Sequence, residues 1–264
     1  MRKLIIQLLL SITALFFLLS GCLNIKVPNK IIRTTDNTVI KKENSYFPIE
    51  SFVMTTQEFV FSISCENDKN EECIEGILGS QTSMGSGFIL ETSSKDEYIV
   101  TAGHICMPPK MPMVPGPLAS NLRVAYRISL TTGFGREGRG EIVAIDTNND
   151  ICLLKANKDL GPGLEIAQKD MMLHSKVYNM ANPAGLSSPL AVPVFDGYYI
   201  GDISMISLFT VPAVGGSSGS PIMNHKNEVV SIVSAAAVRF DEYAIGPKTR
   251  SIREFLLAHL PDDS

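Results

Sequence analysis

The sequence contains no tryptophan, and charged residues make up only 19 % of its 264 residues. Lysine and arginine total 23 against 27 aspartates and glutamates and form no basic block. This excludes a nucleic-acid-binding surface, because phosphate binding needs clustered positive charge. The four histidines form neither an H-E-x-x-H motif nor a Cys/His cluster, so we expect no metal and no cofactor. Apolar residues still make up 45 %, which suits a globular domain with a buried core.

The N-terminus carries the longest apolar run, residues 4–20, directly after Arg2 and Lys3. The run is short for a membrane span, which needs about 20 residues, but is long enough for a secretory signal. It ends in Leu-Ser-Gly-Cys at Cys22, which resembles the lipobox of bacterial lipoproteins. The resemblance implies cleavage before Cys22 and its acylation, with an uncleaved anchor as the alternative. Both interpretations predict an exported chain that is held at a membrane.

We therefore expect a signal peptide over residues 1–21, a lipid-anchored tether over 22–50 and one domain over 51–264. The tether is polar and irregular, and a structured extension packed on the domain is the alternative. Leu23 follows Cys22, where an aspartate would retain many lipoproteins in an inner membrane. The outer membrane or the cell surface is therefore the expected location.

The sequence from about residue 51 onward has the pattern of an all-β domain. Short runs rich in valine, isoleucine, phenylalanine and tyrosine recur between turn residues, which is typical of a barrel or sandwich. These runs are 59–64, 87–91, 97–101, 123–130, 141–145, 151–155, 176–180 and 228–234. Five prolines within residues 107–118 predict a loop, and apolar residues at helical spacing predict one helix over 251–260.

Three segments carry residues that suit nucleophilic catalysis. A buried strand ends in Thr-Ala-Gly-His at His104, Asp150 opens an apolar strand, and Ser218 lies within GGSSGSP, residues 215–221. In this order, at separations of 46 and 68 residues, they resemble the chymotrypsin-fold serine proteases, and the bacterial HtrA-type enzymes in particular. GSGF over residues 85–88 and NPAG over 182–185 support the resemblance. HtrA-type enzymes usually carry PDZ domains after the protease, but only four residues follow the expected helix, so we expect this apparatus to be absent or supplied in trans.

The resemblance implies two six-stranded antiparallel Greek-key β-barrels, with their boundary near residues 160–170, and a C-terminal helix. It also implies a serine endopeptidase that acts on exported or surface proteins. A serine hydroxyl is a weak nucleophile and needs a base, which would be His104, oriented by Asp150. The backbone N–H groups of Gly216 and Ser218 would bind the oxyanion.

Two alternatives remain open for the function. Ser217 fits the G-x-S-x-G elbow of α/β-hydrolases, although the chain order is wrong and Pro221 stands where the helix should follow. A catalytically silent lipoprotein that uses the fold as a binding module is the second alternative. A cysteine nucleophile at Cys106 or Cys152 is disfavoured, because neither has flanking glycines.

The sequence also supports more detailed expectations for the specificity pocket and for the disulfides. The resemblance places Pro212 at the base of the S1 pocket, and Ser234, Ala235 and Ala236 along one wall, which favours a small or medium apolar P1 side chain. Ser234 aligns with a residue that often hydrogen-bonds the triad aspartate. The short spacing of Cys65 and Cys73 favours a local disulfide in an exported domain, whereas Cys106 and Cys152 are equally expected to be free or bonded.

Overall fold

A computed structural model describes residues 47–63, 76–108, 122–237 and 240–261 of the chain. The chain divides into two units, Met1–Ser45 and Tyr46–Ser264. The first unit, and with it the expected signal peptide and Cys22, lies outside the described residues. The second unit begins with a single 3-10 turn, η1 (Ile49–Ser51), and Phe47 and Ile49 already pack against the core. The domain thus includes the last residues of the segment expected to be a tether.

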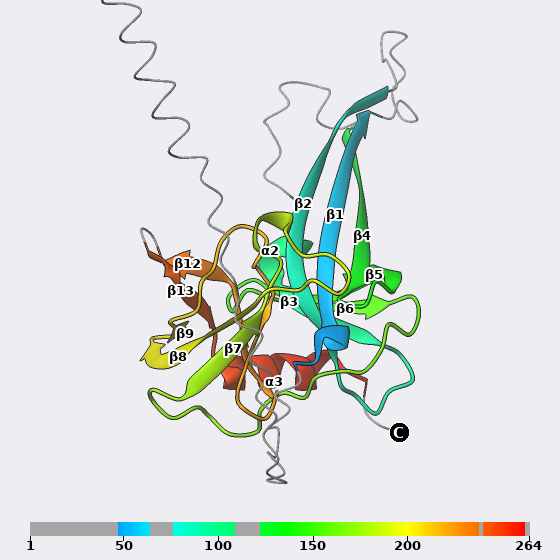
Figure 1. Cartoon of the computed structure of the whole chain (residues 1–264). Helices are drawn as coiled ribbons and strands as arrows, with labels where there is room; N and C mark the ends of the chain where they lie inside the picture. The colour runs from blue at the N-terminus through cyan, green and yellow to red at the C-terminus, as the bar shows by residue number, and fades with distance from the viewer. Residues whose placement is uncertain (1–46, 64–75, 109–121, 238–239, 262–264) are drawn as a thin grey trace, which may run out of the picture. The chain divides into compact units, whose positions relative to one another are not determined.

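The first half of the domain is a closed antiparallel barrel of six strands in the order β1-β2-β3-β6-β5-β4 (Figure 1). Its strands are β1 (Phe52–Ile63), β2 (Gly76–Leu90), β3 (Tyr98–Ala102), β4 (Leu122–Thr132), β5 (Glu137–Asp146) and β6 (Ile151–Ala156). Both β3 and β6 read as nearly continuous apolar runs because almost every residue in them is buried. The expected first barrel is confirmed.

The second half is a seven-stranded sheet in the order β11-β10-β7-β8-β9-β13-β12. Its strands are β7 (Lys176–Met180), β8 (Val194–Ile203), β9 (Ile206–Phe209), β10 (Pro221–Met223), β11 (Val229–Ile232), β12 (Ala235–Ala237) and β13 (Phe240–Pro247). The all-β class is therefore confirmed, while this sheet stands where a second six-stranded barrel was expected. Its neighbouring strands all pair antiparallel, with irregular register at several pairs.

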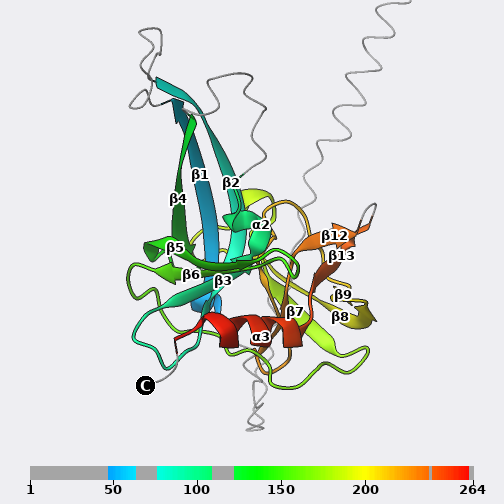
Figure 2. The same ribbon diagram turned by 180° about the vertical axis from the view of Figure 1, so that it is seen from behind.

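One helix of substantial length, α3 (Thr249–His259), closes the described part of the domain, and Figure 2 shows it below both halves. Its apolar residues recur three and four positions apart and so form one face. The Thr249 hydroxyl donates a hydrogen bond to the Val230 carbonyl at 2.6 Å, which fixes the helix start on β11. The helix joins both halves in one core, which contains Phe52, Phe88, Val100, Met223, Val229, Ile232, Ile252, Phe255 and Leu256. The expected terminal helix is confirmed.

A three-stranded ribbon extends from the first barrel, as both views show (Figures 1 and 2). β1 pairs with β2 from Phe52 to Ile63 and with β4 from Val53 to Ile63. β3, in contrast, pairs only with the last four residues of β2, and β5 pairs only with the second half of β4. The outer parts of β2 and β4 therefore have β1 as their strand neighbour within the described chain.

Two further observations bear on function. None of the helices within the described ranges is long and apolar enough to cross a bilayer. Across the same ranges, no group of three or more His, Cys, Asp or Glu side chains is placed to hold a metal ion.

Candidate active site

His104 and Asp150 lie at adjacent ends of two paired strands. His104 is in the short helix α2 (Gly103–Cys106) directly after β3, and Asp150 directly precedes β6. Since Ala102 of β3 pairs with Ile151 of β6, the barrel register itself brings the two residues together. A Cβ on Gly103 would lie 3.0 Å from the backbone of Asp150, which explains the glycine before the histidine.

The Asp150 carboxylate holds both the backbone and the ring of His104. Its Oδ1 accepts the His104 backbone N–H at 2.7 Å, and its Oδ2 lies 2.9 Å from His104 Nδ1. An ionised carboxylate only accepts hydrogen bonds, so Nδ1 must carry the proton and the neutral ring presents Nε2 as an acceptor. The pair is partly accessible, with 41 % of the His104 side chain and 25 % of the Asp150 side chain exposed. This is the arrangement that a catalytic base requires.

Ser218 reaches this neighbourhood from the second sheet, in the loop before β10. Its backbone carbonyl accepts the N–H of Ser86 on β2 at 2.8 Å. Gly219 follows at φ +85°, and a Cβ there would lie 2.2 Å from the Ser86 carbonyl oxygen and 2.3 Å from Thr101 Oγ1. Only glycine allows this close approach, which brings the serine loop against the end of β3 that leads into His104. Among the described residues no hydrogen bond joins Ser218 Oγ to the His104 ring.

Hydrogen bonds from two other segments of the chain fix the carbonyl groups of Gly215 and Gly216. The Gly215 carbonyl accepts the Ala184 N–H at 2.7 Å, and the Gly216 carbonyl accepts the Ser86 hydroxyl at 2.8 Å. Ser86 Oγ in turn accepts the Asn182 N–H at 2.9 Å. A trans peptide directs its N–H away from its C=O, so the Gly216 N–H points away from the turn that contains Ala184. Within the described chain, neither this N–H nor that of Ser218 donates to another group.

Ser217 lies in a different environment from Ser218. It is 1 % exposed, its N–H donates to the Val214 carbonyl at 2.9 Å, and its hydroxyl accepts the Val214 N–H at 3.4 Å. The chain after the serines continues into β10 rather than into a helix. Burial and the lack of a following helix both contradict the elbow alternative, whereas Ser218 is partly exposed.

Of the residues expected around the S1 pocket, Pro212 lies just before the serine loop, and Ser234, Ala235 and Ala236 come after β11. Pro212 and Ala235 are exposed, and Ala236 is partly buried in β12. The expected hydrogen bond from Ser234 to Asp150 is wrong, because Ser234 Oγ is buried with no partner among the described residues. The Ser234 N–H donates to Ile245 of β13 at 2.8 Å, so the second sheet, not Asp150, fixes this residue.

The structure settles the open question on two cysteines. Cys106 and Cys152 form a disulfide with a Cα–Cα distance of 6.4 Å, and both are buried in the first barrel. Each follows a site residue by two positions, so the bond ties the segment after His104 to the strand after Asp150. The expected Cys65–Cys73 bond and all but the first two residues of the loop expected over 107–118 lie outside the described residues.

Ser86, Asn182 and Ala184 are positioning residues to which the sequence assigned no role. They lie in the GSGF and NPAG motifs, which the sequence offered only as marks of a family resemblance. Ala184 bonds Gly215 and Ser86 bonds Gly216, about 30 and 130 positions away in the chain, while Asn182 bonds Ser86 from 96 positions away. Such contacts are not visible before the fold is known.

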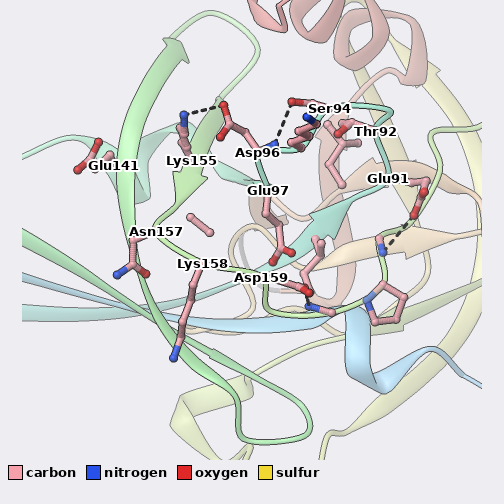
Figure 3. Close-up of a pocket in the computed structure, with 17 residues that line it drawn as sticks. Glu91, Thr92, Ser94, Asp96, Glu97, Glu141, Lys155, Asn157, Lys158 and Asp159 are labelled. Carbon is pink, nitrogen blue, oxygen red and sulfur yellow. Dashed lines mark hydrogen bonds and ion pairs between the residues drawn. The ribbon is translucent and has the colours of Figure 1, made fainter. Parts of the chain in front are cut away.

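A separate cavity of about 760 Å³ lies on the first barrel (Figure 3). Carboxylates and lysines line it, among them Glu91, Glu97, Asp159 and the ion pair of Lys155 with Asp96 at 2.6 Å. Burial, reinforced by the nearby Asp159 carboxylate, raises the pKa of Glu97 to about 7, although the Leu160 N–H that it accepts opposes the shift. The cavity contains no residue of the candidate active site.

Comparison with known proteins agrees with this geometry. The trypsin-like peptidase domain family matches residues 85–232, more than half of the chain. A probable periplasmic DegP-like serine endoprotease of Halomonas elongata is 28 % identical over 174 residues, covering 64 % of this chain and 33 % of that protein. A putative serine protease, HhoB of Synechocystis, is 27 % identical over 171 residues, covering 61 % and 36 %. This chain therefore matches about a third of each relative's length.

Two solved structures share the fold. A serine endoprotease of Yersinia pestis aligns with a TM-score of 0.56 at 16 % identity, over 81 % of this chain and 64 % of that one. The active form of a protease from M. tuberculosis aligns with a TM-score of 0.55 at 15 % identity, over 80 % and 81 %. The chain thus belongs to the trypsin-like peptidase family, with a chymotrypsin-type fold and relatives of the DegP/HtrA type.

Proposed function

We propose that this chain is a serine endopeptidase in which His104, Asp150 and Ser218 form the catalytic triad. The observation that carries the proposal is the Asp150 carboxylate bound to both the backbone N–H and Nδ1 of His104, at 2.7 and 2.9 Å. The serine loop is hydrogen-bonded to Ser86, on the strand that pairs with β3. The family match and the DegP-like relatives support the same reaction class.

In the proposed reaction, His104 Nε2 takes the Ser218 hydroxyl proton as Oγ attacks the carbonyl carbon of the scissile peptide bond. Asp150 keeps Nδ1 protonated and stabilises the imidazolium that forms. The tetrahedral intermediate expels the amine, which leaves with the proton from His104, and an acyl-enzyme remains on Ser218. Water, deprotonated by the same imidazole, then hydrolyses the ester and restores the serine.

The N–H groups of Gly216 and Ser218 are proposed to bind the oxyanion of that intermediate. Support comes from the anchoring of the Gly215 and Gly216 carbonyls, which fixes the peptide before substrate arrives. Donors held in advance need no reorganisation during the reaction, and losing one typically costs about 2.7–4 kcal/mol of transition-state stabilisation.

The substrate's P1 side chain is proposed to be small or medium and apolar. Pro212 offers no charge to pair with lysine or arginine, and Ala235 and Ala236 offer only methyl groups. Each buried methylene contributes about 0.8 kcal/mol, so we expect a graded preference among Ala, Val and Leu. A peptide series that varies P1 alone measures this preference.

Acylated Cys22 is proposed to tether the enzyme to the outer membrane or the cell surface, where exported proteins would be its substrates. The support is the sequence Leu-Ser-Gly-Cys after the apolar run. We expect cells fed a palmitate analogue to label the full-length chain, and Cys22→Ala to abolish that label. Persistent labelling of Cys22→Ala would contradict the proposed anchor.

A catalytically silent binding module remains the second candidate. The observation that favours it is the missing hydrogen bond between Ser218 Oγ and the His104 ring. Such bonds are often long without substrate and tighten in the enzyme–substrate complex, so we prefer the enzyme.

Hydrolysis of a peptide panel and an ester panel by the full-length chain tests the proposal. We expect cleavage of internal peptide bonds after apolar residues, loss of activity in Ser218→Ala, and retained activity in Ser217→Ala. Folded wild-type protein that cleaves neither panel would favour the binding module. Cleavage of esters alone would contradict the endopeptidase.

A further inference from the structure

Two turns of the second half, with the strand ends beside them, expose apolar side chains next to each other. One turn precedes β7 and the other joins β8 to β9, and both lie at the same corner of this half in Figures 1 and 2. A Cβ on Gly201 of β8 would lie 3.2 Å from Leu173 Cδ2, so the first turn contacts the strand that leads into the second. The apolar turn patch comprises five side chains that are 37 to 78 % exposed: Met172, Leu173, Ile203, Met205 and Ile206.

The backbone holds both turns in place. The His174 N–H donates to the Tyr199 carbonyl at 2.8 Å, and the Tyr199 N–H donates to the Ser175 carbonyl at 3.0 Å, which fixes the first turn on β8. The second turn is a tight hairpin, because Ile203 pairs with Ile206 across two residues. Turn positions usually carry polar residues. A single exposed apolar side chain is ordinary, whereas a contiguous group of them marks an interaction surface.

The patch lies on the outer face of the second sheet. On the inner face, Tyr199 belongs to the core and its hydroxyl donates to the Asp202 carboxylate at 2.7 Å. Successive residues of a strand point to opposite faces, and the β8–β9 ladder is regular from Gly201 onward. Gly201 and Ile203, on either side of Asp202, therefore point outward, and so does Ile206, the cross-strand partner of Ile203.

The chain enters the domain on this same outer face. The Phe47 ring packs against Tyr178 of β7, with 5.2 Å between the centroids. Lys176 pairs directly with Tyr198 of β8, and its ammonium lies 5.3 Å from the Tyr178 centroid, so these three side chains share one face. Tyr198 adjoins Tyr199, whose side chain is on the inner face, so the shared face is the outer one. The segment that leads back to Cys22 thus leaves the domain on the face that carries the patch.

We propose that the apolar turn patch inserts into the surface of the phospholipid bilayer that holds the N-terminus. The inference rests on the proposed anchor at Cys22 and not on the catalytic triad. Even fully extended, residues 23–46 span at most about 80 Å, so Phe47 stays within that distance of the acylated cysteine. A second contact on a linked molecule forms at a high effective concentration, so a small inserted surface is sufficient.

The charges and the size of the patch favour lipid as the occupant. The patch contains no charged side chain, and ion pairs beside it join Lys176 to Asp196 at 3.1 Å and Lys248 to Asp202 at 3.2 Å. Binding should therefore depend on apolar insertion, not on the anionic lipid that a basic patch requires. A second copy of the chain is disfavoured, because a stable interface typically takes about 20–30 residues from each partner.

The first test uses tryptophan, which the chain lacks, as a depth reporter. The full-length chain with Leu173→Trp or Met205→Trp is reconstituted in phosphatidylcholine vesicles with or without bromine on the acyl chains. We expect brominated lipid to lower the tryptophan fluorescence about twofold or more at both positions, because an inserted apolar face reaches the acyl boundary. Leu257→Trp, on an exposed leucine of α3 outside the patch, is the matched control and should keep its fluorescence.

This test separates failure of the patch from failure of the anchor. No quenching at Leu173 and Met205, in a chain whose Cys22 takes the palmitate label, overturns the proposal and leaves the anchor intact. Equal quenching at Leu257 also overturns it, because the domain would then present no preferred face to the bilayer. Quenching at both patch positions in a chain that takes no label supports the patch and contradicts the anchor alone.

The second test disrupts the patch and leaves the reporter in place. Ile203→Glu, added to the Leu173→Trp chain, is expected to restore the fluorescence to the level of the Leu257→Trp control, because burying a carboxylate in lipid is costly. Leu257→Glu in the same reporter chain is the matched control and should leave the quenching unchanged. Circular dichroism checks that both variants fold. Quenching that survives Ile203→Glu in the folded protein overturns the proposal.

Two further measurements test other origins of the contact. Vesicles with and without anionic lipid should quench Leu173→Trp alike, and quenching that requires anionic lipid would assign the contact to charge and overturn insertion. Light scattering without vesicles tests self-association. A dimer that Ile203→Glu converts to monomer would assign the patch to a second copy of the chain and overturn the proposal.

Discussion

His104 depends on a single carboxylate for its tautomer, its ring orientation and part of its backbone position. Asp150 provides all three through bonds of 2.7 and 2.9 Å, and it adopts φ +56° to do so. Few residues other than glycine accept a left-handed backbone, and aspartate is among them. The residue type at 150 is therefore fixed both by the backbone and by the chemistry.

Asp150→Asn should lower kcat by about 10⁴-fold with little loss of fold. An asparagine amide that donates to Nδ1 would leave the proton on Nε2, so the ring could not accept the Ser218 proton. Initial rates on a peptide substrate, with folding checked by circular dichroism, measure the effect. Asp96→Asn removes a carboxylate from the surface pair with Lys155 and should stay within twofold of wild type. Equal losses in both variants would contradict the assigned role.

Glu97 should make the stability of the domain depend on pH. Its pKa is raised from 4.5 to about 7, so the folded state holds the proton more tightly than the unfolded chain does. The stabilising contribution is complete below about pH 4.5 and is lost as the pH rises through about 7. Glu97→Gln should therefore show a smaller fall in melting temperature between pH 5 and pH 8 than wild type.

Differential scanning fluorimetry across that pH range measures the difference between the two proteins. Glu91→Gln, which removes another carboxylate from the same cavity, controls for the change in net charge. Parallel curves for wild type and Glu97→Gln would show that Glu97 does not carry this dependence.

At the scale of elements, one buried hydroxyl joins three segments that are distant in sequence. Ser86 on β2 donates to Gly216 in the serine loop and accepts from Asn182 in the turn before η3 (Pro183–Gly185). Its backbone N–H holds Ser218 as well. β2 therefore positions the proposed oxyanion donors although it contributes none of them.

Ser86→Ala should reduce kcat by about 10- to 100-fold and change KM little. The substitution leaves the partly buried Gly216 carbonyl and the buried Asn182 N–H without their partner, at a cost of up to about 1–3 kcal/mol per group, and loosens the peptide that donates to the oxyanion. Steady-state kinetics on one peptide substrate measure both constants. Ser83→Ala on the same strand removes only a hydrogen bond to Gln57 and should match wild type. A loss confined to KM would contradict the positioning role.

The disulfide also links two elements at the site, because Cys106 lies in α2 and Cys152 lies in β6. Cys106 and Cys152 are 46 residues apart in sequence, and closing such a loop typically stabilises a protein by about 2–4 kcal/mol. Replacing both cysteines by alanine should lower the free energy of unfolding in urea by this amount. Dithiothreitol should shift the wild-type midpoint in the same direction. A wild-type midpoint unaffected by reductant would contradict the bond.

Across the whole molecule, the sequence predicted the strands of five or more mostly buried residues better than the exposed or very short ones. β3, β6 and β7 were predicted to within one residue at each end. β3 and β6 are nearly all buried and read as apolar runs, whereas β7 alternates buried and less buried residues over part of its length. β8 and the outer part of β2 were missed because they are mostly exposed or half-buried and contain glycine or polar residues. β9 and the buried β10 were missed because they are only four and three residues long. Their strand conformation depends on pairing with distant partners, which periodicity does not reveal.

At the candidate active site, too, features marked in the local sequence were predicted, and features that depend on distant partners were not. His104, Asp150 and Ser218 stood out because glycines and strand ends mark them, and the structure brings the segments that contain them together. The hydroxyl of Ser234 could not be placed from sequence, because it depends on the pairing of its backbone with β13. Likewise, the bonded state of Cys106 required the register of β3 and β6.

The measurement that tests the triad most directly is the position of a fluorophosphonate adduct. Full-length wild type, His104→Ala and Ser217→Ala are treated with the probe, digested and mapped by tandem mass spectrometry. We expect one adduct, on Ser218, in wild type and in Ser217→Ala, and none in His104→Ala. An adduct on Ser217, or equal labelling of Ser218 without His104, would contradict the assignment of nucleophile and base.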